Sequence, residues 1–236
     1  MKPPNFIAPI LAFFSALTCY AQDTSVIFIP AGSSILEKLP PAKRYKYHEF
    51  RTGKVVFKDS SIATSKLNYS FLSGEVEFIG PTNDTLAIAD DKASLIKDIL
   101  IDSNVFYYNK EFFEEIANHP ETGRLLKKQL FSEMDREKIG AYDMASPTSA
   151  VQTYSSVGNK IHSIVEGLVA KENLFLKVTE EYFIENKNNE TVPLTKKNLL
   201  KLYSPRKRAI NDYLDKNPVN FNREDDLKRL FLAINN

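Results

Sequence analysis

The clearest pattern of alternating apolar and polar residues lies between residues 66 and 88. Such alternation is typical of a half-buried β-strand, because successive side chains of a strand point to opposite faces. Ser73-Gly74 fits a two-residue hairpin turn, which predicts that Tyr69 lies opposite Phe78. A turn at residues 81–84 then places Phe78 opposite Leu86. The stretch predicts a three-stranded antiparallel meander with one apolar core face, formed by Tyr69, Phe71, Val76, Phe78, Leu86 and Ile88.

Other strand-like segments surround this meander. A turn is expected at residues 51–53, because Arg-Thr-Gly separates two alternating stretches there. Residues 112–117 fit either a strand or one helical turn. Residues 144–158 contain six Ser or Thr residues and no charge, which favours a long surface loop. The remaining predicted strands are at residues 26–29, 45–49, 55–57, 94–102, 104–108, 123–132, 161–166 and 173–185.

The C-terminal stretch has the punctuation of three short helices. Thr195 is placed to cap the first helix, and Ser204-Pro205 is expected to begin the second. Asn222 and Asp225 have the spacing of a capping box for the third. That third helix carries an apolar stripe at helical spacing, formed by Leu227, Leu230, Phe231 and Ile234.

These elements predict an α+β protein. An antiparallel β-meander, in the form of a sheet, roll or partly open barrel, precedes a C-terminal segment of about three short helices. The expected divisions are an N-terminal leader segment at 22–44, a β-rich domain at 45–192 that includes the 144–158 loop, and the helical segment at 193–236.

The N-terminus has the features of a signal peptide covering residues 1–21. Lys2 precedes an apolar run over residues 6–17, which is too short for a membrane-spanning helix. Small residues at the −3 and −1 positions favour cleavage after Ala21; a lipoprotein anchored through Cys19 is the less favoured alternative. We therefore expect an exported protein of the periplasm or cell surface, without a transmembrane helix or a disulfide in its mature chain.

Charge is balanced over the chain but concentrated locally. The 31 basic and 30 acidic residues become 30 of each once Lys2 is removed, which argues against nucleic acid as a partner. Residues 194–208 hold no acid. This run is expected to be a solvated helix surface, or alternatively a contact for an anionic lipid surface, a phosphate group, a glycan or an envelope protein. Its basic residues are Lys196, Lys197, Lys201, Arg206, Lys207 and Arg208.

Candidate chemistry is sparse. His48, His119 and His162 lack metal-ligand spacing, and the sequence holds neither a Gly-x-Ser-x-Gly elbow nor a phosphate-binding glycine loop. No cofactor, metal or catalytic residue is therefore predicted. Asp90 and Asp91 are the acidic candidates for a ligand contact, although exposed Asp at strand ends is commonly only surface decoration.

Several phrases of the chain resemble a group of exported proteins of Gram-negative bacteria whose function is uncharacterised. The resemblance lies in residues 53–59 (GKVVFKD), 66–69 (KLNY), 75–79 (EVEFI), 83–86 (NDTL), 137–142 (EKIGAY) and 197–202 (KNLLKL). It spans nearly the whole mature chain and implies no activity and no site residue.

Together these features favour a non-enzymatic binding or structural module of the cell envelope. Two alternatives stay open. One is a hydrolase with a scattered Ser/His/Asp triad or carboxylate pair. The other is a protein that binds envelope lipid or glycan.

Overall fold

The computed structural model describes residues 26–134, 169–170 and 173–235. Its main feature is one antiparallel sheet in the order β1-β10-β9-β8-β7-β6-β2-β3-β4-β5, with β11 also paired to β10. The strands are β1 (Ile27–Ile29), β2 (Arg51–Phe57), β3 (Ile62–Tyr69), β4 (Val76–Ile79), β5 (Thr85–Ala87), β6 (Ile96–Ile101), β7 (Asn104–Asn109), β8 (Glu111–His119), β9 (Gly123–Glu133), β10 (Leu174–Glu185) and β11 (Thr191–Pro193).

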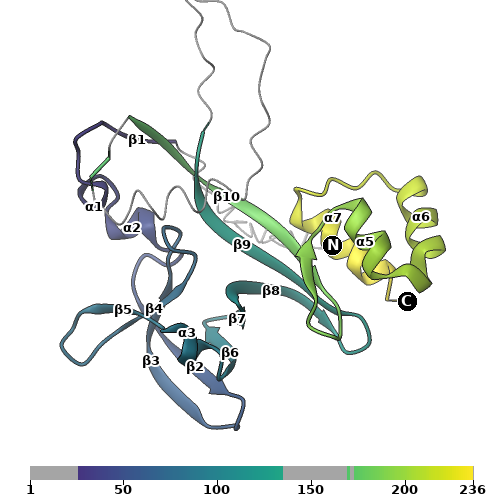
Figure 1. Ribbon diagram of the computed structural model, residues 1–236, viewed down its shortest axis with the longest axis horizontal. Helices are drawn as coiled ribbons and strands as arrows, with labels where there is room; N and C mark the ends of the chain where they lie inside the picture. The colour runs from purple at the N-terminus through teal and green to yellow at the C-terminus, as the bar shows by residue number, and fades with distance from the viewer. Residues whose placement is uncertain (1–25, 135–168, 171–172, 236) are drawn as a thin grey trace, which may run out of the picture.

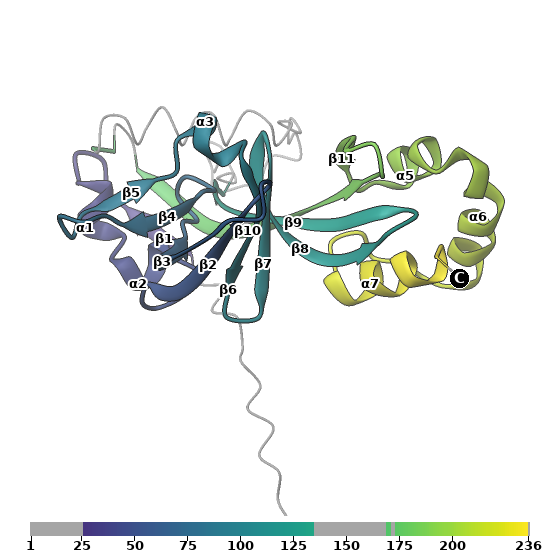
Figure 2. The same ribbon diagram turned by 90° about the horizontal axis from the view of Figure 1, so that it is seen from below.

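Helices lie at both ends of the described chain and on one connection between strands. The longest β-strands, β9 and β10, cross the molecule between the group β2–β7 and the C-terminal helices (Figures 1 and 2). The predicted α+β class, an antiparallel meander with short C-terminal helices, is therefore confirmed. The helices are α1 (Ile35–Lys38), α2 (Pro41–Arg44), α3 (Asp90–Ala93), α5 (Lys196–Leu202), the 3-10 turn η1 (Ser204–Arg206), α6 (Lys207–Lys216) and α7 (Glu224–Ala233).

The β3–β4 hairpin differs from its predicted register by two residues. Tyr69 pairs with Val76 rather than with Phe78, so the loop is longer than Ser73-Gly74 and includes Phe71. The Phe71 carbonyl accepts a hydrogen bond from the Phe131 N–H on β9 (2.8 Å), a contact that competes with continuing β3. A shift of two keeps every side chain on its face, so the alternation alone could not exclude it.

The β4–β5 pairing follows the prediction, with Phe78 opposite Leu86. Tyr69 and Val76 are buried, and Phe71, Phe78 and Ile88 pack against the same cluster. Leu86, however, is 39% exposed, so its assignment to the core is wrong. The reason is its position on β5, the edge strand, whose three residues are all exposed.

The predicted turn at residues 51–53 is wrong, because β2 begins at Arg51 and runs through it. Gly53 instead allows the neighbouring strands to approach closely. A Cβ there would lie 2.6 Å from the Leu100 carbonyl oxygen and 2.8 Å from Leu67 Cδ1. The strand expected at residues 45–49 is reduced to one isolated bridge between Tyr45 and Ser70.

The ambiguous segment at 112–117 is a strand, within β8. The segments predicted at 26–29, 94–102, 104–108, 123–132 and 173–185 correspond to β1, β6, β7, β9 and β10. The predicted signal peptide, the predicted loop at 144–158 and the strand predicted at 161–166 lie outside the described residues. Among the helices that are described, none combines the length and apolarity needed to cross a membrane.

Three apolar clusters hold the sheet and helices together. The first lies on β2, β3, β6 and β7 around Tyr69 and Phe106, whose rings stack 5.2 Å apart. The second joins β1 and α1 to β9 and β10. The third seats α5, α6 and α7 on β9 and β10, using Leu125, Tyr182, Ile184, Leu194, Leu199, Tyr203, Ile210, Leu227, Leu230, Phe231 and Ile234.

The helix ends show which local signals hold. Thr195 caps α5 by accepting a hydrogen bond from the Asn198 N–H (3.2 Å), as predicted. The Ser204-Pro205 pair forms η1, and α6 begins only after it. The predicted capping box at Asn222 is wrong: α7 has Arg223 at its N-cap position without a side-chain cap.

Candidate functional site

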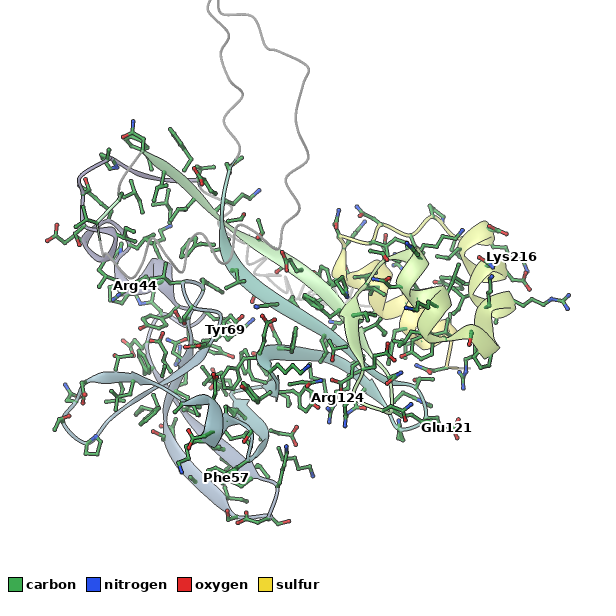
Figure 3. The ribbon with its side chains drawn as sticks, viewed as in Figure 1. Arg44, Phe57, Tyr69, Glu121, Arg124 and Lys216 are labelled. Carbon is green, nitrogen blue, oxygen red and sulfur yellow. The ribbon has the colours of Figure 1, made fainter. Side chains whose placement is uncertain are left out.

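Two clusters of charged side chains lie on opposite faces of β9. Lys127 and Arg124 are three residues apart in one strand, so their side chains point to opposite sides of the sheet. Figure 3 shows Arg124 and Glu121 toward the tip of the β8–β9 hairpin and Tyr69 in the other half of the sheet. These clusters bring ionisable residues of several strands within 4 Å of one another, so they are the first candidates for a site.

The Lys127 cluster, which comprises Lys46, Glu114, Lys127, Glu180 and Glu224, joins the sheet to α7. The Lys127 ammonium lies 2.8 Å from the Glu224 carboxylate, 3.4 Å from Glu114 and 3.9 Å from Glu180. Glu114 is also bound by Lys46 at 2.8 Å. The side chains of Lys127 and Glu114 are only 8% and 7% exposed, so these charges are largely removed from water.

Neutral hydrogen-bonding groups complete this cluster. Gln129 accepts from the Lys46 ammonium (3.0 Å) and donates to Glu180 (2.9 Å). Tyr182 donates to Glu180 at 2.6 Å, and Asn104 donates to Glu114. Each carboxylate therefore has at least two partners, as buried charges require.

The electrostatics favour the ionised forms of Lys127 and Glu224. Burial disfavours the charged form of Lys127, but Glu114 and Glu224 outweigh it and raise the pKa of the ammonium. Burial likewise opposes ionisation of Glu224, yet its hydrogen bonds to Lys127 and Lys228 hold the pKa of the carboxyl below its usual range. An acid–base catalyst needs a pKa near the working pH, and these shifts move both groups away from it.

The Arg124 cluster, which comprises Tyr107, Glu115, Arg124 and Glu185, occupies the other face. The Arg124 guanidinium lies 3.9 Å from the centre of the Tyr107 ring and pairs with Glu115 (2.9 Å) and Glu185 (3.2 Å). Asn109 donates to Glu185 at 2.9 Å, which ties the end of β7 to β10. The cluster therefore links strands that are not neighbours in the sheet.

Glu115 is the carboxyl of this cluster whose pKa is raised. Burial raises the pKa of its carboxyl, and the Arg124 charge only partly opposes that effect. Its side chain is 18% exposed and bound to Arg124. A carboxyl held by an arginine in this way is suited to fixing strand geometry, and proton transfer would first require the ion pair to open.

The structure separates the predicted acidic candidates from both clusters. Asp90 and Asp91 begin α3 and are exposed. Asp90 accepts a hydrogen bond from the Tyr108 hydroxyl at 3.2 Å, and Asp91 lies 3.5 Å from the Lys92 ammonium. A ligand role for either stays a prediction.

The basic candidates gather on α5, η1 and α6. Arg206 is engaged in the fold, since it donates to the Ile234 carbonyl at the end of α7 and lies 3.8 Å from Glu121. The other basic residues of this run are exposed, and none forms an ion pair with another residue of the described chain. They are Lys196, Lys197, Lys201, Lys207 and Arg208.

Groups that could support the hydrolase alternative are dispersed. His48 is exposed in the segment before β2, Asp98 is half-buried on β6, and His162 lies outside the described residues. Within the described ranges, no group of three or more His, Cys, Asp or Glu side chains could hold a metal ion.

Sequence reasoning missed both ionic clusters, although one signal for them exists. Glu114-Glu115 and Lys127-Lys128 are adjacent like-charged pairs within strands. Because neighbouring strand residues face opposite ways, one member of each pair must point into the packed face.

Comparison of the chain with protein-family models, with curated proteins and with solved structures found no match.

Proposed function

We propose that this chain is an exported, non-enzymatic binding module of the cell envelope. The observation that carries the proposal is the use of the sheet's ionisable groups: the acids and bases of the Lys127 and Arg124 clusters bind one another. A catalytic group must meet substrate in a reactive protonation state. Side chains held in such ion pairs stabilise the sheet, so a ligand would be bound by other residues, on the protein surface.

Export is supported by the predicted leader over residues 1–21. Expression of the full chain in a Gram-negative host, followed by fractionation and N-terminal sequencing, tests this part. We expect the mature protein in the periplasm or on the cell surface, beginning at Gln22. Retention of Met1 in the cytoplasm would contradict export. Lipid labelling that disappears in a Cys19→Ala variant would show the lipoprotein route in place of cleavage after Ala21.

The non-enzymatic part is tested by turnover. Purified protein is incubated with panels of chromogenic esters, glycosides and peptides, and release of product is followed over hours. The expected rate is that of a buffer blank. Turnover at an enzyme-like rate that is abolished by Glu115→Gln, while the fold is retained, would refute the proposal and favour the carboxylate-based hydrolase.

A further inference from the structure

The helical segment carries a strong local excess of positive charge. Residues 193–216 contain seven basic and two acidic residues, whereas the whole chain has a formal net charge of +1. The excess therefore belongs to this segment and is balanced elsewhere. A local field of this kind attracts anionic partners even when the protein as a whole is nearly neutral.

Packing on the sheet directs these charges to solvent. Leu199 of α5 and Ile210 of α6 are buried in the cluster that seats the helices on β9 and β10. With 3.6 residues per turn, Lys197 and Lys201 lie on one face of α5, turned away from Leu199. Lys216, at the end of α6, stands on the side of the segment away from the sheet (Figure 3).

The positions of four of these cations, at the starts of α5 and α6, cost stability. α5 begins with Lys196-Lys197 and α6 with Lys207-Arg208, and neither helix has an acid in its first turn. Cations at the positive end of a helix dipole are unfavourable by several tenths of a kcal/mol each. α7 follows the favourable rule, with Glu224, Asp225 and Asp226 in its first turn. The charges that begin α5 and α6 thus do not serve the fold, whereas Lys201, in the last turn of α5, lies where a cation is favourable.

We infer that Lys196, Lys197, Lys201, Lys207 and Arg208, the basic helix surface, dock the protein on the anionic phospholipid headgroups of a bilayer. This inference rests on the proposed binding function and names its partner. Clusters of four to eight Lys or Arg residues are the usual means of attraction to anionic lipid. Four of the five cations are Lys, a flexible point charge suited to attraction by a charged surface, whereas bidentate recognition of a single phosphate, sulfate or carboxylate group favours Arg.

Vesicle co-sedimentation tests the inference. The purified protein is mixed with phosphatidylcholine vesicles that contain either no phosphatidylglycerol or about a third of it, at low and high salt. The test variant combines Lys196→Gln, Lys197→Gln and Lys201→Gln. The control variant combines Lys54→Gln, Lys66→Gln and Lys97→Gln, which removes three exposed lysines from the sheet. A Lys→Arg variant at the three test positions retains the charge.

We expect binding only to the anionic vesicles, weakening with salt because screening shortens the reach of the charges. The test variant should bind about 100-fold more weakly, whereas the control and Lys→Arg variants should bind as the parent does. Equal binding to both vesicle types, equal loss in the control variant, or binding to soluble dextran sulfate with none to vesicles would overturn the inference. Such failures leave the proposed function standing, because that function is tested by turnover and export.

Discussion

Replacing Lys127 by Met tests whether the Lys127 cluster fastens α7 to the sheet. Met keeps much of the length and apolar stem of Lys but removes the ammonium. Glu224 and Glu114 then lose contacts of 2.8 Å and 3.4 Å, respectively. Both keep a second cation, since Lys228 lies 2.6 Å from Glu224 and Lys46 lies 2.8 Å from Glu114.

The expected loss in the free energy of unfolding is about 3 kcal/mol. Removing one partner of a buried ion pair typically costs about 3–5 kcal/mol, because a charge is left in a poorly solvated site. The lower end applies here because each carboxylate retains another cation. Urea denaturation at pH 7 measures the loss, provided that the denaturant slope is unchanged.

Lys128→Met is the matched control. Lys128 is the next residue of β9, points to the opposite face and pairs with Glu111, whose side chain is 53% exposed. The Lys128 side chain is only 13% exposed, but the exposed carboxylate of Glu111 keeps its water when the partner is removed, so this variant should lose about 1 kcal/mol. Combining Lys127→Met with Glu224→Gln should cost less than the sum of the single losses, since the two residues interact directly.

The pH dependence gives a second reading of the same contact. The pKa of Glu224 is lowered in the folded state, so its contribution is present above the unfolded value of about 4.3 and is lost as pH falls through the folded value. The pKa of Lys127 is raised, so its contribution is lost only as pH rises through a value above 10.5. The penalty of Lys127→Met should therefore be constant from about pH 5 to 10 and shrink at pH 3. A penalty below 0.5 kcal/mol at pH 7, or one equal to that of Lys128→Met, would refute this account of the cluster.

Three further stability measurements follow from the fold. Gly123→Ala should destabilise the protein by about 4 kcal/mol or more, because Gly123 has φ +106° and a Cβ there would lie 1.9 Å from the Glu185 carbonyl oxygen. Gly32 also has a positive φ, +78°, but lies in open space, so Gly32→Ala should cost only about 1–2 kcal/mol; urea denaturation measures both losses. Thr195→Ala should cost about 1 kcal/mol by removing the α5 cap, and an unchanged urea midpoint would contradict that role. Burial raises the pKa of the Glu181 carboxyl, so its ionised form is unfavourable in the folded protein at pH 7. Glu181→Gln should therefore raise the free energy of unfolding at pH 7 and reduce the gain in stability on acidification to pH 5. A loss of stability at pH 7 would contradict the raised pKa.

The strands of the sheet could be predicted because their burial is one-sided, which the sequence records as alternation. The register of the β3–β4 hairpin could not, because a two-residue shift preserves both faces. Gly53 was misinterpreted as a turn residue for a related reason. A glycine is needed there because Leu100 and Leu67, on neighbouring strands, leave no room for a side chain. At such positions, contacts with residues distant in sequence determine the structure, and the local sequence preference does not.

The candidate site likewise combines features that the local sequence predicts with features that depend on long-range contacts. The basic run was visible in the sequence because its residues are consecutive, but the separation of Arg206 from the others depends on Ile234 and Glu121, which lie far along the chain. The ionic clusters draw their members from several strands and from α7, so only the folded chain assembles them. Single-sequence reasoning therefore identifies surface charge more readily than buried charge.

The pairing of β1 with β10 constrains the order in which the chain can fold. Ile27 lies opposite Leu176, so among the described strands β1 pairs with one alone, in a segment made much later. The hairpins from β2 to β9 close over short separations and can form early, whereas this pairing must close a loop that contains most of the protein. During synthesis, Ile27–Ile29 remains without its partner strand until β10 has emerged. Completion of the sheet is thus a late step, and a chain cut short before β10 would expose an unpaired apolar strand to aggregation.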